Sequence, residues 1–199
     1  MNWYRKAQSD PKDQLVESLT SMMESVVPKT PKTFIPGSRY AHPDQFFLEH
    51  GQFFESQPLT PEEMAKVKKV SGSGKQFKMK ECFYNAQKLS SISKFQYVEG
   101  YVLSGIPFAI SHAWNVINGK VIDVTLAHRN GDKVIAGILP EGWAYFGVDF
   151  PVKEIMKIWL QHEMSQPIIS WESSFEYLKR NFPEATDTDQ ITPSEETKT

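Results

Sequence analysis

Three residue types with an obvious chemical use follow one another along this chain: a cysteine, a histidine and an aspartate. Cys82 is the only cysteine among the 199 residues. His112 lies in segment 111–116, and Asp123 lies in segment 122–125. A thiol, an imidazole and a carboxylate are the parts of a cysteine nucleophile, its base and the group that orients the base. If the three side chains meet in space, they could attack a carbonyl carbon.

A turn between the last two segments predicts how His112 and Asp123 are arranged. Asn118-Gly119 is typical of a two-residue hairpin turn of type I′, here between predicted strands 108–117 and 120–126. Side chains alternate between the two faces of a strand, so this register groups four residues on one face. They are His112, Trp114, Asp123 and Thr125.

The same register separates two candidates for orienting His112. Asp123 is its diagonal neighbour, about 7–8 Å away at the backbone and within side-chain reach. Asn115 pairs with Ile122 and points to the opposite face. The register therefore favours Asp123 over Asn115.

The nucleophile is predicted to lie near the start of a helix over residues 80–91. Unpaired backbone N–H groups and the helix dipole stabilise a thiolate at that end of a helix. Lys78 and Lys80 add positive charge close to Cys82. These features favour a thiol that reacts near neutral pH, with His112 taking and returning its proton.

Four further side chains are candidates for binding the reacting groups. Gln76 precedes Cys82 by six residues, and its amide could hold the oxyanion of a tetrahedral intermediate together with the Cys82 N–H. Tyr84 and Asn85 follow the cysteine and are candidates for substrate contact. Trp114 fits equally a core position or a wall over the imidazole.

The elements around this set predict an α+β domain, with helices first and an antiparallel sheet after them. Residues 1–71 are predicted to form a helical and aromatic-rich N-terminal arm, residues 72–182 the core, and residues 183–199 a disordered tail. Within the arm, the patterns predict a helix over 12–26 and an irregular segment over 28–59 that contains a short helix near 43–50. A capping box at Thr60–Glu63 predicts the start of a further helix, which runs to about Val70 and is followed by a flexible link at 71–74. Beyond the cysteine helix, they predict strands 97–103, 108–117, 120–126, 133–139 and 143–150 and helices 151–163 and 171–181.

The composition of the chain limits the kinds of binding partner and cofactor that we expect. The net charge of −2 argues against a generally basic nucleic-acid binder. The sequence shows neither the roughly 18 apolar residues of a membrane span nor a signal peptide at Met1, which predicts a cytoplasmic protein. The four histidines outside the set lack metal-ligand spacing, so no metal is expected.

The segments around Cys82, His112 and Asp123 together resemble the transglutaminase-like core of the papain-like cysteine peptidase superfamily. The resemblance covers roughly residues 76–126, through a helix-borne cysteine, a Tyr-Val-Glu-Gly-Tyr-Val strand, His-Ala-Trp and Asp-Val-Thr. It implies a papain-like fold with Cys82 as nucleophile, His112 as base and Asp123 as the orienting acid. Gln76 matches the spacing of the oxyanion glutamine in papain-type members.

The expected function is that of a thiol hydrolase or acyl transferase, of peptidase, isopeptidase or glutamine-deamidase type. It would act through a Cys82 thioester on a protein, a peptide or a small amide, without a cofactor. The alternative is a catalytically inactive transglutaminase-like binding protein, since Glu81 and Phe83 replace the Gly and Trp usual around the cysteine. A third hypothesis makes residues 28–59 a lid over Cys82, hinged at 71–74.

Overall fold

The protein is a mixed α+β domain, as the sequence predicts. The computed structural model describes residues 10–26, 35–55, 57–71, 77–78, 80–126, 143–162 and 166–184. The helices in this part of the chain are α1 (Pro11–Val26), α2 (Pro43–His50), α3 (Pro61–Ser71), α4 (Cys82–Ile92), α6 (Val152–His162) and α7 (Glu176–Asn181). The strands are β1 (Gln52–Phe54), β2 (Gln96–Ser104), β3 (Ile110–Ile117), β4 (Lys120–Ile122) and β5 (Trp143–Phe150).

The five strands form one antiparallel sheet in the order β1-β5-β2-β3-β4. The sheet curls until its two outer strands meet. Glu55, just after β1, bridges Lys120 in β4, and the Val121 N–H donates to the Glu55 carbonyl at 3.1 Å. This contact ties the two edges of the sheet together at one point and encloses its concave face.

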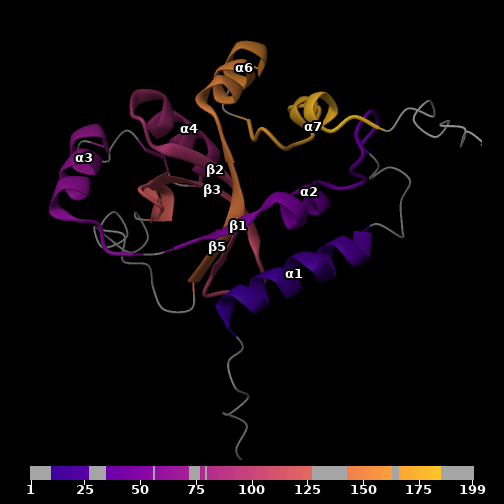
Figure 1. Ribbon diagram of the computed structural model, residues 1–199, viewed down its shortest axis with the longest axis horizontal. Helices are drawn as coiled ribbons and strands as arrows, with labels where there is room; N and C mark the ends of the chain where they lie inside the picture. The colour runs from indigo at the N-terminus through magenta and orange to yellow at the C-terminus, as the bar shows by residue number, and fades with distance from the viewer. Residues whose placement is uncertain are drawn as a thin grey trace, which may run out of the picture.

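Each face of the sheet has its own core. On the outer face, Tyr97, Tyr101 and Ala113 pack with apolar residues from α1, α2, α6 and α7. Ala86 of α4 belongs to the same cluster, and Figure 1 shows α3 and α4 to one side of β5 in the view, with α1, α2 and α7 to the other. The enclosed face holds Val98, Val102, Trp114, Val116, Val121, Leu126 and Tyr145. Because strand residues alternate, His112 and Trp114 point towards this enclosed cluster.

The hairpin between β3 and β4 has the predicted turn and register. Asn118 and Gly119 have φ values of 50° and 80°, as a type I′ turn requires. Ile117 pairs with Lys120, and Asn115 pairs with Ile122. Glu63 of α3 fixes the turn from outside, since its carboxylate accepts hydrogen bonds from Asn118 Nδ2 and Lys120 Nζ, each at 2.8 Å. The turn chemistry was therefore sufficient to predict the local pairing.

Most predicted elements are present, with three corrections. The helix over 171–181 is limited to Glu176–Asn181, because Ser174 and Phe175 have φ values of 52° and leave the helical region. The strand predicted over 120–126 ends at Ile122 and is followed by a helical turn. Strand β1 lies within the segment predicted to be irregular. The link residues 72–74, strand 133–139 and tail residues 185–199 fall outside the described residues.

The N-terminal arm is part of the same core as the sheet. Leu15 and Leu19 of α1 and Phe46 of α2 are buried in the cluster that contains Tyr97. Strand β1 pairs along β5, with Phe53 opposite Phe146. This packing favours a structural role for residues 35–55 over the role of a separate lid.

Candidate active site

Cys82 is the first residue of helix α4 and is partly exposed. The chain enters the helix through a tight turn in which Lys80 has a φ of 64°, a conformation that non-glycine residues rarely adopt. Glu81 stands at the N-cap but makes no side-chain cap hydrogen bond. No side-chain cap therefore occupies the N–H groups of the first turn, and the thiol lies at the positive end of the helix dipole.

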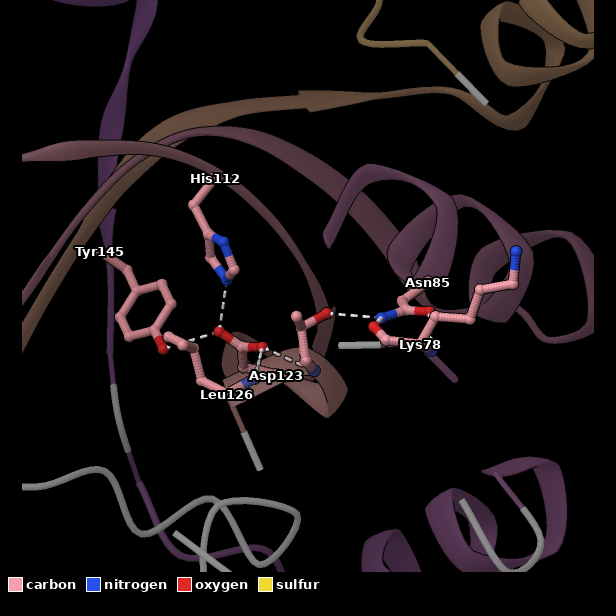
Figure 2. Close-up of polar contacts among 7 residues, drawn as sticks. Lys78, Asn85, His112, Asp123, Leu126 and Tyr145 are labelled. Atoms are coloured by element: carbon pink, nitrogen blue, oxygen red, sulfur yellow. Dashed lines mark hydrogen bonds and ion pairs between the residues drawn. The ribbon is translucent and has the colours of Figure 1, made fainter. Parts of the chain in front are cut away.

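His112 and Asp123 form a buried ion pair. Nε2 of His112 lies 2.6 Å from Oδ2 of Asp123, and the side chains are 4% and 1% exposed. Figure 2 shows the imidazole above the carboxylate, with Tyr145 to the left of the carboxylate. The predicted contact between His112 and Asp123 is thus present, although Asp123 lies beyond the end of β4.

Four donors hold the Asp123 carboxylate in place. Its Oδ1 accepts the N–H groups of Thr125 at 3.0 Å and Leu126 at 2.9 Å, which is the bonding of a helix N-cap. Its Oδ2 accepts the hydroxyl of Tyr145 at 2.9 Å as well as the bond from His112. This cap is the physical reason that the strand stops at Ile122, because Asp123 bonds the backbone of a helical turn instead of a neighbouring strand.

The opposite charges of His112 and Asp123 stabilise each other and shift the pKa of both groups. Burial alone would lower the pKa of His112, but the charge and hydrogen bond of Asp123, followed by the Cys82 side chain, outweigh it and raise that pKa to about 10. Burial alone would raise the pKa of Asp123, but His112 and the hydrogen-bond donors hold it below its ordinary value. At neutral pH the site therefore contains an imidazolium facing a carboxylate, with the Cys82 side chain interacting with the imidazolium.

Tyr145 is a part of the site that sequence reasoning missed. Its ring packs edge-on against Trp114, with centroids 5.1 Å apart. Burial and the neighbouring Asp123 raise the pKa of Tyr145, so its hydroxyl remains a donor to the carboxylate. Within predicted strand 143–150, no local signal distinguished this tyrosine from an ordinary core residue.

Trp114 packs nearly parallel to the His112 ring. Its ring plane is within 16° of the His112 ring, at a centroid distance of 6.3 Å. The side chain is only 1% exposed. It therefore satisfies both predicted descriptions, core residue and wall of the imidazole, and its burial leaves little surface for a substrate.

Asn85 connects the nucleophile helix to the turn that holds Asp123. It is fully buried, and its side-chain amide bonds both backbone groups of Lys78 at 2.9 and 2.7 Å. Its Nδ2 also donates to Thr125 Oγ1 at 2.9 Å, the central contact in Figure 2. This burial leaves Asn85 no surface for the predicted substrate contact, and its hydrogen bonds instead fix the turn around Thr125 relative to α4.

The two remaining candidates for binding the reacting groups are Tyr84 and Gln76. Tyr84 lines a cavity of about 930 Å³ on the exposed side of α4, together with Phe83 and Trp159. Lys78 Nζ lies 4.9 Å from the centre of the Tyr84 ring. Gln76, the predicted oxyanion residue, lies outside the described residues.

The raised pKa of His112 predicts a defined pH dependence of stability. A histidine whose folded-state pKa exceeds its unfolded value of about 6.5 contributes stability that is complete below that pH. This contribution is lost as pH rises through about 10. We expect the difference in unfolding free energy between wild type and His112→Gln, measured in urea, to shrink steadily from pH 6.5 to 10. A constant difference over this range would contradict a buried imidazolium.

In comparisons with protein-family models, curated proteins and solved structures, nothing matched this chain. The described helices include none that is long and apolar enough to cross a membrane. Within the same segments, no three His, Cys, Asp or Glu side chains are placed to share a metal ion. A functional conclusion therefore depends on the arrangement of residues described above.

Proposed function

We propose that this protein is a cysteine-dependent amide hydrolase or acyl transferase with a papain-like, transglutaminase-type core. The peptidase, isopeptidase and glutamine-deamidase reactions all fit this proposal, since each attacks an amide carbonyl. The observation that carries it is the His112–Asp123 pair at 2.6 Å, whose imidazole also interacts with Cys82, a partly exposed cysteine at a helix N-terminus. These are the geometric parts of an activated thiol nucleophile.

Acylation would begin with the thiol proton on the imidazole. Asp123 engages Nε2 of His112, so Nδ1 is the ring nitrogen left for Cys82. The thiolate attacks the amide carbonyl, and an S–C bond forms as the carbonyl oxygen becomes an oxyanion. The intermediate collapses when the C–N bond breaks, and His112 gives its proton to the leaving amine. The product is a thioester at Cys82 and a free amine or ammonia.

Deacylation would return the enzyme to its starting state. The neutral imidazole takes a proton from water or an amine, which attacks the thioester carbonyl. The C–S bond then breaks and the thiolate is restored, with the proton held on His112. Asp123 stays ionised throughout and keeps the ring oriented.

The surroundings of Cys82 supply the remaining requirements. The backbone N–H groups at the start of α4 are suited to an oxyanion, because they lack a side-chain cap and lie at the positive helix end. Gln76 is proposed as a second donor, as its spacing from Cys82 predicts. The cavity beside Tyr84 and Phe83 is large enough for two or three residues of a peptide.

The single cysteine makes a direct test possible. The rate of alkylation by iodoacetamide should stay high below pH 7 in wild type and fall about tenfold or more at pH 6 in His112→Gln, because the thiolate loses its counter-ion. The matched control is His162→Gln at the end of α6, which should react like wild type. Cys82→Ser should take up no label.

A second readout follows the chemistry itself. A panel of peptide, isopeptide and glutamine amides is incubated with the wild type and quenched in acid, and mass spectrometry is used to look for an acyl adduct on Cys82. An adduct that is absent in His112→Gln supports the proposal. A slow thiol with an ordinary pH profile, unchanged in His112→Gln, would contradict it and favour the inactive binding protein.

A further inference from the structure

A second cavity, of about 300 Å³, lies between α2, β2 and the segment leading to α7. It begins next to Cys82, on the face of β3 opposite the one that carries the His112 side chain. Phe83, which lines it, follows Cys82, and Ser111, which also lines it, precedes His112. A substrate held at Cys82 could therefore place a neighbouring side chain in this cavity.

Asp44 is one of the residues that line this cavity, and one of its carboxylate oxygens has no hydrogen-bond partner. The side chain is 2% exposed, and its Oδ1 accepts the hydroxyl of Tyr101. Its Oδ2 is buried and has no hydrogen-bond donor. His42 Nδ1 lies 3.2 Å from Oδ2 and accepts the Asp44 N–H as the side chain of the helix N-cap. The helix dipole of α2 accounts for an acid at this position but not for the missing donor.

The other charged residues of the cavity indicate which charge a hydrogen-bond donor to Asp44 would carry. No lysine or arginine is among its lining residues. Glu99 is buried there too, but its carboxylate is already used by the Tyr97 hydroxyl and the N–H groups of Ile168 and Ile169. Glu172 is exposed and adds negative charge. Asp44 is therefore the acid in this cavity that still needs a cation.

The shape and walls favour an alkylammonium. Phe47, Phe175 and the 58%-exposed Trp171 supply aromatic surface, which attracts a cation and covers its aliphatic stem. One free oxygen matches the compact ammonium better than a guanidinium, which prefers two oxygens side by side.

We propose that this cavity is a recognition subsite for a primary ammonium group of the substrate, such as a lysine side chain, with Asp44 Oδ2 as its anchor. The ammonium takes no part in the acyl step. This inference rests on the proposed function for its place next to Cys82, but ammonium binding can be measured without catalysis.

The test uses the full-length Cys82→Ser protein and two acetylated, methylamide-capped amino acids, lysine and its uncharged analogue norleucine. Ligand-observed NMR titration should give a dissociation constant about tenfold lower for the lysine compound, because a charge-assisted hydrogen bond is gained. Asp44→Asn, which keeps the shape and the acceptor for Tyr101, should remove this preference. Glu172→Gln should change it less than about threefold, as expected for an exposed charge.

The outcomes separate the two proposals. Equal affinity for lysine and norleucine in the Asp44 protein would overturn the subsite, whatever the thiol does. A lysine preference that survives Asp44→Asn would also overturn it, since the anchor would lie elsewhere. A preference lost in Asp44→Asn supports the subsite even if Cys82 proves inert, in which case only the catalytic proposal fails.

Discussion

Replacing Asp123 by asparagine should disable the site and destabilise the fold. The asparagine Oδ1 can still cap the turn at Thr125 and Leu126, but its amide nitrogen would face two donors, His112 Nε2 and the Tyr145 hydroxyl. Removing one charge of a buried pair costs about 3–5 kcal/mol. Any amide hydrolysis should fall by about 10²- to 10⁴-fold, because the imidazolium loses its partner and orientation. Urea unfolding and Cys82 alkylation at pH 6 measure both effects.

A matched variant makes this expectation specific. Asp149→Asn changes an exposed aspartate on β5, so its unfolding free energy should remain within about 0.5 kcal/mol of wild type. Asp123→Ala also removes the helix cap and should be less stable than Asp123→Asn by about 1 kcal/mol. An Asp123→Asn protein with the unfolding free energy and the Cys82 alkylation rate of wild type would contradict the buried ion pair between His112 and Asp123.

Gly147→Ala should severely destabilise the sheet. A Cβ there would lie 2.3 Å from the Glu99 carbonyl oxygen and 2.8 Å from Cη2 of Trp114. Gly147 pairs with Gly100 across β5 and β2, so the strands approach too closely for any side chain. We expect a loss of about 3 kcal/mol or more, since backbone must move to relieve the contact.

The same substitution should also change the thiol. Trp114 packs against the His112 ring, so a displaced indole would disturb the base. The thermal unfolding temperature and the alkylation rate of Cys82 should therefore both be lower in Gly147→Ala than in wild type. Asp149→Ala on the same strand is the control and should change neither. A fully stable Gly147→Ala protein would show that β2 and β5 are farther apart than described.

Local turn chemistry explains why the sequence predicted the hairpin and the His112–Asp123 contact. Asn118-Gly119 determined the register, and the register determined which acid could reach the imidazole. The helical turn after Ile122 was missed because Val124 and Thr125 favour strands, whereas the Asp123 carboxylate caps the N–H groups of Thr125 and Leu126. Two local preferences disagreed here, and the helix cap prevailed.

Contacts between distant segments could not be read from the sequence. Tyr145 reaches Asp123 because β5 and β3 flank β2, an order that no local pattern specifies. Strand β1 has three residues and depends on β5 for its pairing, so its own sequence carried no strand signal. Asn85 is three residues after Cys82 in the sequence, but it faces the Lys78 backbone and the turn at Thr125.

The sheet order also has a consequence for the time course of folding. The ladder partner of β1 is β5, which is made much later during synthesis from the N-terminus. The β2–β3–β4 meander, with His112 and its neighbours, can pair before β5 exists, whereas Phe53 and Phe54 must wait. Such long-range pairing is slow. Nascent chains that stop short of residue 143 should therefore expose an unpaired aromatic segment, making β5 insertion the step at which chaperones would act.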